Sequence, residues 1–289
     1  MNLRAILFPG LMALAGLGLS GCAEMQGVLG DVVKSAPKPS ASVKGAKFQD
    51  LSQQSATMLF DVEIENPYGF ALPLTDVTYG LAAGGSDTSV FQGAQKLTGT
   101  VPAKGTRTVE LPLTIGFQEL LTAVQGVRPG QVLPYRANFD LSMTNPSGGD
   151  PIRLPIEKKG ELPVPAAPEV TVEDVAWENL SLANADGVLK LKVKNTNEFA
   201  ASLAQMGYDL KLSGTSVAKG SLRDAANFEA GGEQTLEIPF SVRPMDLGLA
   251  AFNMMKSGQA SYDLTGDIDL GTPFAPITHE FSKSGRTGG

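Results

Sequence analysis

Residues 60–66 read Phe60-Asp61-Val62-Glu63-Ile64-Glu65-Asn66, a run in which apolar and acidic side chains alternate up to an asparagine. A period of two is typical of a β-strand with one buried face and one exposed face. The pattern returns at residues 189–195, where Leu189, Leu191 and Val193 alternate with three lysines before Asn195. The apolar face is kept while the outer face changes sign, which indicates two copies of one β domain.

An internal repeat extends this correspondence over most of the chain. Asn66 corresponds to Asn195 at an offset of 129 residues, and Tyr135 corresponds to Tyr262 at an offset of 127. A drift this small is what short loop deletions produce. We therefore predict two homologous domains, at residues 43–160 and 169–285.

Other alternating runs favour the same architecture in both copies. Strands are expected at residues 108–113 and 135–143, and at their repeat partners, residues 235–240 and 262–270. Each copy has one helix-like stretch, at residues 117–124 and 245–256. Short strands separated by Gly-rich turns predict an all-β fold. It consists of two tandem immunoglobulin- or fibronectin-III-like antiparallel β-sandwiches, each with one short helix.

The N-terminus is organised as a secretory signal. Arg4 precedes an uncharged apolar stretch, residues 5–19, which ends in Leu19-Ser20-Gly21-Cys22. This ending resembles the lipobox of bacterial lipoproteins. The resemblance implies that residues 1–21 are removed and that Cys22 is acylated, and two or three acyl chains anchor a protein stably. The alternative is a free buried cysteine beside an ordinary signal peptide.

The same resemblance suggests a location and a domain layout. Ala23, which follows the cysteine, favours the inner leaflet of the outer membrane, facing the periplasm. Residues 22–42 are expected to be a flexible tether between the lipid and the first domain. Three prolines within residues 161–168 predict an extended, semi-rigid linker. Residues 286–289 form a short tail.

Composition excludes several classes of function. The 289 residues include 23 basic and 30 acidic side chains, a net charge of −7, so nucleic acid is not an expected partner. One Cys and one His cannot form an ordinary zinc site, and neither a metal nor a cofactor is expected. His279 is the sole candidate for histidine-based catalysis, and it corresponds to Leu154 in the first copy. We interpret His279 as structural and do not expect an enzyme.

Charge is unequal between the copies. Residues 43–160 carry 10 basic and 11 acidic side chains, whereas residues 169–285 carry 9 and 16. The outer faces of the two alternating strands are opposite in sign, and they suggest electrostatic pairing between domains or between molecules. These candidate interaction faces are Asp61, Glu63 and Glu65 on one strand and Lys190, Lys192 and Lys194 on the other. The alternative is two independently solvated faces, because exposed ion pairs contribute little.

One stretch carries a family resemblance. Residues 65–81 read Glu65-Asn66-Pro67-Tyr68-Gly69-Phe70-Ala71-Leu72-Pro73-Leu74-Thr75-Asp76-Val77-Thr78-Tyr79-Gly80-Leu81. They resemble the late-embryogenesis-abundant (LEA) type 2 family, also called the water-stress and hypersensitive-response (WHy) domain. The second copy keeps Asn195 but lacks the proline. The resemblance implies a fibronectin-like sandwich, no enzymatic activity and a role in desiccation tolerance. Asn66, Pro67 and Asn195 are interpreted as structural turn residues.

Two functions follow as expectations. The first is a non-enzymatic, lipid-anchored envelope protein that protects neighbouring proteins or membrane during water stress. The second is an envelope interaction scaffold or a carrier of apolar ligands. It would use the sandwich loops or the Met-rich helix at residues 245–255, since methionine-rich surfaces adapt to varied partners. Beyond the membrane, the expected partner is an envelope protein or client of unknown identity.

Overall fold

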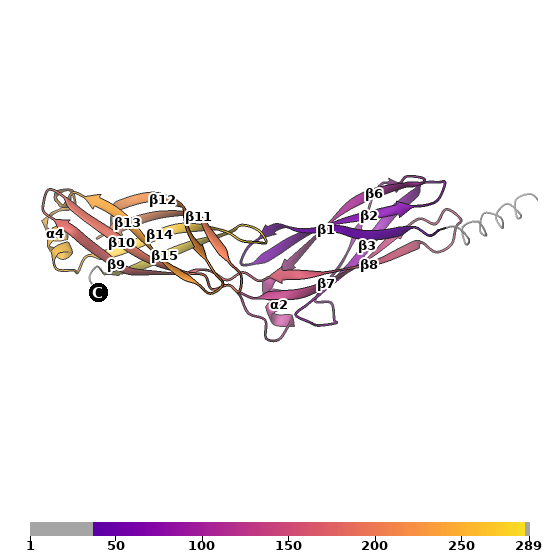
Figure 1. Cartoon of the computed structure of the whole chain (residues 1–289), viewed down its shortest axis with the longest axis horizontal. Helices are drawn as coiled ribbons and strands as arrows, with labels where there is room; N and C mark the ends of the chain where they lie inside the picture. The colour runs from indigo at the N-terminus through magenta and orange to yellow at the C-terminus, as the bar shows by residue number, and fades with distance from the viewer. Residues whose placement is uncertain (1–36, 287–289) are drawn as a thin grey trace, which may run out of the picture.

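The computed structural model describes residues 37–286, which form two β-sandwiches that lie end to end (Figure 1). The first sandwich runs from β1 (Ser40–Leu51) to β8 (Ile152–Pro163), and the second from β9 (Glu169–Leu180) to β15 (Ile277–Arg286). The predicted all-β class with two tandem antiparallel sandwiches is confirmed. The signal peptide, Cys22 and most of the predicted tether lie outside the described residues.

The first sandwich packs two antiparallel sheets face to face. One sheet has the order β1-β2-β6, with β2 at Ser55–Asn66 and β6 at Gly105–Gly116. The other has the order β4-β3-β7-β8, with a short fifth strand, β5, paired to β3. The strands of this second sheet are β3 (Leu72–Ala83), β4 (Phe91–Lys96), β5 (Thr100–Val101), β7 (Val132–Met143) and β8.

The second sandwich repeats this topology with one difference. One sheet has the order β13-β10-β9 and the other the order β12-β11-β14-β15. A single long strand, β12, stands where the first copy has β4 and β5. The bounds are β10 at Ala185–Lys194, β11 at Ala201–Leu212, β12 at Thr215–Phe228, β13 at Glu233–Val242 and β14 at Ser261–Gly271. Register agrees as well, because Leu141 pairs with Leu154 and its counterpart Ile268 pairs with His279.

The alternating strands supply the centre of each core. Phe60, Val62 and Ile64 of β2 are completely buried, and Leu189 and Leu191 of β10 are equally so. Burial of one such side chain stabilises the fold by roughly 1.5–3 kcal/mol, so the apolar face of each strand fixes its orientation in the sandwich.

The helices differ between the copies. The first sandwich has α2 (Phe117–Ala123) after β6, as predicted. The second has two helices, α3 (Pro244–Leu247) and α4 (Leu249–Lys256), so the expectation of one short helix is wrong there. Gly248 separates them with a φ of 88°, a left-handed value at which a helix cannot continue. No helix within residues 37–286 is long and apolar enough to cross a membrane.

The predicted linker, residues 161–168, is packed and hydrogen-bonded over part of its length. Strand β8 continues through Pro163, which pairs with Val132 of β7, and Val164 N then donates to Gln131 O at 2.8 Å. Pro163, Val164 and Pro165 are buried. The first sandwich also begins earlier than expected, because Ser40 pairs with Glu65 within the β1-β2 ladder.

Candidate functional site

The first asparagine turn closes the free end of the first sandwich. Asn66 is the last residue of β2 and is 1% exposed. Its Nδ2 donates to Phe70 O at 2.7 Å and to Pro102 O at 3.0 Å, and its Oδ1 accepts from Tyr68 N at 3.0 Å. One buried amide therefore joins the end of β2, the following turn and the loop before β6. Pro67 cannot donate to a ladder, so the strand ends beside it.

The second turn has the same geometry without the proline. Asn195 is 2% exposed, and its Nδ2 donates to Phe199 O at 2.7 Å and to Glu229 O at 3.1 Å. Its Oδ1 accepts from Asn197 N at 3.1 Å. The structure thus places both predicted asparagines in turns that tie equivalent loops together, and Pro67 is dispensable for that geometry.

The residues that differ between the two turns hold the interdomain segment. Thr196, at the position of Pro67, donates from Oγ1 to Ala167 O at 2.7 Å. Asn197, at the position of Tyr68, accepts from Ala166 N at 2.8 Å and donates to Ala166 O at 3.3 Å. Asn197 is 2% exposed. The departures of the second copy from the motif thus fix residues 166 and 167 against the second sandwich.

The loop between α2 and β7 completes this polar junction from the first sandwich. Gly130 N donates to Val164 O at 2.6 Å, and Gly130 O accepts from Glu198 N at 2.7 Å. Gly130 has a φ of 93°, and a Cβ there would lie 2.6 Å from Thr196 O. An exposed ion pair between Arg128 and Glu198, 3.2 Å apart, lies beside these contacts.

An aromatic contact forms the apolar part of the junction. Phe274, in the loop between β14 and β15, lies edge-on to Phe199 and to Phe48 of the first sandwich, with ring centroids 5.4 and 5.9 Å apart. Phe199 and Ile277 of the second sandwich belong to the core of the first. The equivalent loop of the first copy reads Ser147-Gly148-Gly149 and offers no aromatic ring.

His279 lies at this junction as well. Its Nδ1 is 3.0 Å from Gln53 Nε2, in the turn between β1 and β2 of the first sandwich. Because the Gln53 amide nitrogen can only donate, the ring must present an unprotonated Nδ1. Burial lowers the pKa of His279 below its usual 6.5, Lys283 lowers this pKa further, and Glu280 opposes both. The environment therefore favours the neutral ring that the contact requires.

The two charged faces find partners in their own sheets. Lys190 Nζ lies 3.3 Å from Glu237 and Lys192 Nζ lies 3.4 Å from Glu173, both within the β13-β10-β9 sheet. In the first sandwich, Glu63 lies 3.0 Å from Lys44 of β1. The ion pairs of residues 37–286 include none between the two triplets, so pairing between molecules stays a prediction.

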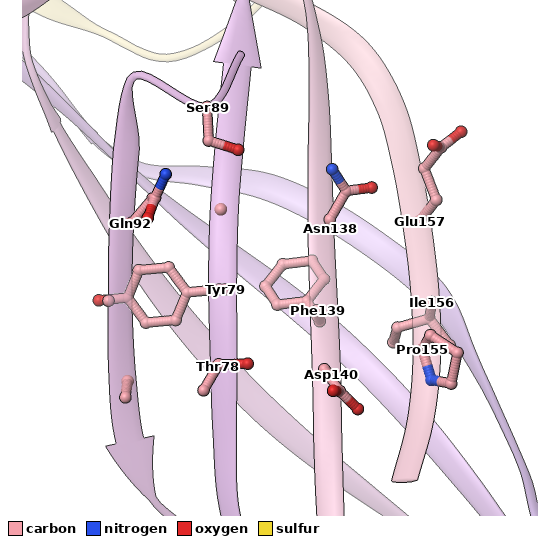
Figure 2. A pocket seen from close by; sticks show the side chains of 13 residues that line it. Thr78, Tyr79, Ser89, Gln92, Asn138, Phe139, Asp140, Pro155, Ile156 and Glu157 are labelled. Atoms are coloured by element: carbon pink, nitrogen blue, oxygen red, sulfur yellow. The ribbon is translucent and has the colours of Figure 1, made fainter. Parts of the chain in front are cut away.

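A shallow hollow of about 970 Å³ lies over strands β4, β3, β7 and β8. Figure 2 shows Gln92, Thr78, Asn138, Asp140 and Glu157 on neighbouring strands around it. Asp140 Oδ2 accepts from Arg153 at 2.8 Å, while its Oδ1 is buried without a hydrogen-bond partner. The lining contains no His, Cys, Lys or Arg. The hollow can therefore offer hydrogen bonds, but it does not assemble a nucleophile with a histidine base.

No group of three His, Cys, Asp or Glu side chains that could hold a metal ion occurs in the described part of the chain. The features that sequence reasoning missed are the buried linker and the aromatic contact. The sequence signal for both features is the difference between the two copies at Thr196, Asn197 and Phe274.

Comparison with known proteins places this geometry in a family. The family model described as "Late embryogenesis abundant protein" (LEA_2) matches residues 61–160 and 190–285, one match in each sandwich. The chain belongs to the LEA type 2 family. The asparagine turns, junction and helices described above are therefore features of a tandem LEA type 2 protein.

Similar proteins are desiccation proteins of plants. The desiccation protectant protein Lea14 homolog of Glycine max is 26% identical over 133 residues, which is 46% of this chain and 86% of that protein. The probable desiccation-related protein LEA14 of Arabidopsis thaliana is 24% identical over 135 residues, or 47% of this chain and 87% of that protein. Each match covers about half of the chain.

Two solved structures also match. The putative LEA protein At2g46140.1 is 19% identical with a TM-score of 0.36, and the match covers 50% of this chain and 87% of that one. The Arabidopsis thaliana protein AT1g01470 is 23% identical with a TM-score of 0.38, covering 46% of this chain and 86% of that one.

Proposed function

We propose that this tandem LEA type 2 protein is non-enzymatic and protects neighbouring proteins or membrane when water is withdrawn. The family match in both sandwiches is the observation that carries the proposal, because the similar proteins are desiccation proteins. The structure adds two folded sandwiches whose outer strand faces are polar and charged, joined through a buried linker.

The proposed mechanism is steric and electrostatic shielding. Each sandwich buries its apolar strand faces and presents charged side chains outward, such as Lys190, Lys192 and Glu237. A net charge of −7 favours solubility and disfavours non-specific adhesion. Such a body between client molecules limits their contact as the volume of water falls.

A drying assay tests protection directly. A client enzyme is dried with the full chain, with an equal mass of an inert acidic protein, or with the Phe60→Asp chain. In that variant a charge placed at a completely buried site unfolds the first sandwich. The proposal expects the highest residual activity with the folded chain. Equal recovery in all three samples would show that mass alone protects, and would overturn it.

We further propose that the protein is a lipoprotein of the outer membrane, held by lipid on Cys22 and facing the periplasm. The sequence Leu19-Ser20-Gly21-Cys22 supports this. The segment from Cys22 to Ser40, if extended at about 3.1 Å per residue, gives the first sandwich a reach of at most about 60 Å. Radioactive fatty acid should label the chain and should not label Cys22→Ser. Label that persists in the variant would contradict the anchor.

One observation favours the second function, an interaction scaffold. Met245 and Leu249 are 71% and 65% exposed at the end of the second sandwich, although most apolar side chains of the strands are buried. Exposed apolar groups that gather in one place mark interaction sites. Co-purification of one defined partner with the tagged chain, lost in Leu249→Glu, is the expected result for a scaffold.

A further inference from the structure

The far end of the second sandwich carries an apolar cluster. Leu182, Met245, Leu249 and Met254 are 45%, 71%, 65% and 42% exposed, and in the described part of the chain Leu121 is the one other large hydrophobic residue that is exposed. They come from the turn between β9 and β10 and from α3 and α4; Figure 1 shows α4 at this end. Met245 N donates to Leu182 O at 3.2 Å, which joins turn and helix into one surface. We call these four residues the apolar end.

The equivalent end of the first sandwich is already a docking surface. Leu182 corresponds to Gln53, which contacts His279 of the second sandwich. Gly258-Gln259 corresponds to Gly130-Gln131, and both glycines have positive φ, 68° and 93°. Gly130 O accepts from Glu198 N in the asparagine turn of the second sandwich. In this molecule, that end of a sandwich therefore receives the asparagine turn of another.

We propose that the apolar end binds the Asn66 turn of a second copy of this chain, so that copies associate head to tail. The Asn66 turn is the counterpart of the Asn195 turn, which occupies the equivalent end within the molecule. It presents an exposed Gly69 and a half-buried Phe70, and Phe70 is the counterpart of the junction residue Phe199.

Charge favours this pairing over an end-to-end contact of two apolar ends. The second sandwich has 9 basic and 16 acidic side chains, so two such sandwiches in contact repel each other. Head-to-tail contact places the second sandwich against a first sandwich that is nearly neutral, with 10 basic and 11 acidic side chains. A heterologous contact of this kind does not close on itself and extends into linear chains.

Photo-cross-linking of the full chain in its host cells tests the proposal. A photoreactive phenylalanine derivative replaces Met245, and adducts are sized and mapped by mass spectrometry. The expected result is a ladder of multiples of the chain, with cross-links to the peptide that contains Gly69 and Phe70. Adducts only to other proteins or lipid, cross-links between two apolar ends, or no adduct would overturn it.

Two charge variants make the test directional. Gly69→Glu and Leu249→Glu each alter an exposed position, and a Cβ at Gly69 meets no atom within 4 Å, so both variants fold. Each alone should lower multimer adducts about tenfold or more, because a charge enters an apolar contact. Differently tagged Gly69→Glu and Leu249→Glu chains expressed together should form a mixed dimer and nothing longer. Leu121→Glu, the matched control, should leave the ladder unchanged. A ladder that survives Gly69→Glu would also overturn the proposal.

Discussion

A single buried amide holds each sandwich end together. Asn66 joins the turn that follows β2 to the loop before β6, which lies 36 residues further along the chain, and Asn195 repeats this role. A half-buried asparagine with solvent-exposed hydrogen bonds in a similar local geometry provides a comparison. Asn145 Oδ1 accepts from Ser147 N at 3.0 Å and its Nδ2 donates to Asp150 O at 3.2 Å. Water can replace these bonds at Asn145 but not at Asn66.

Asn66→Ala should therefore destabilise the first sandwich by about 2–4 kcal/mol, because buried donors and acceptors lose their partners. Asn145→Ala should cost about 0.5 kcal/mol or less, a value typical of surface positions. Urea unfolding followed by amide hydrogen exchange measures both. Equal losses in the two variants would show that burial of the amide is not what matters.

His279 makes the junction sensitive to acid. Its pKa is lowered in the folded chain, so between that lowered value and 6.5 the unfolded chain binds more protons than the folded one. The contribution of His279 to stability is therefore fully present above pH 6.5 and is lost as the pH drops through that range. Protonation also gives Nδ1 a hydrogen that faces the Gln53 amide.

The ring resonances of the sole histidine, followed by NMR in an untagged chain, should titrate below pH 6.5. Gln53→Ala should raise that midpoint toward the ordinary value, because it exposes the ring. His279→Leu, which copies the first domain, should remove the acid sensitivity of the junction. A midpoint above 6.5 in the unaltered chain would contradict this assignment.

The loop between α2 and β7 contains two glycines with left-handed backbone. Only one of them contacts the second sandwich, so the cost of backbone strain can be measured apart from the effect on the junction. Gly126 and Gly130 both have positive φ, 80° and 93°. A Cβ at Gly126 meets nothing within 4 Å, whereas one at Gly130 would lie 2.6 Å from Thr196 O of the second sandwich.

Gly126→Ala should cost about 1 kcal/mol, which reflects the left-handed backbone alone. Gly130→Ala should cost this amount and also separate the sandwiches, since the new methyl group displaces Thr196 O. Thermal unfolding gives the first effect and small-angle X-ray scattering gives the second. If both variants scatter alike, the Gly130 contact does not hold the junction.

The strands could be predicted from the sequence because alternation records burial directly. Phe60, Val62 and Ile64 alternate with acidic residues in the sequence, and all three are completely buried in one core. The second helix of the second copy was missed because Gly248 lies inside an apolar stretch that reads as one helix. The burial of the linker could not be predicted because composition describes the conformation of an isolated segment. In this structure the linker is held by hydrogen bonds with Asn197 of the second sandwich and Gly130 of the first.

Across the whole chain, the contacts at the junction between the sandwiches lie at positions where the two copies differ in sequence. The turn residues Asn66 and Asn195 were predictable as structural, since one repeated asparagine follows each alternating strand. The junction could not be predicted. Its contacts involve Thr196, Asn197 and Phe274, whose partners in the linker and in the first sandwich are known only from the folded structure. In the second copy of this LEA type 2 pair, Thr196 therefore stands at the position of the motif proline and contacts the linker.

The linker and junction contacts should hold the two sandwiches in one fixed relative orientation. Backbone residual dipolar couplings of the aligned chain test it most directly, because they report the orientation of each sandwich separately. One alignment tensor should fit both sandwiches in the unaltered chain, and two different tensors should be needed for Asn197→Ala. Two tensors of unequal magnitude in the unaltered chain would show that the sandwiches move independently and that these contacts do not fix their orientation.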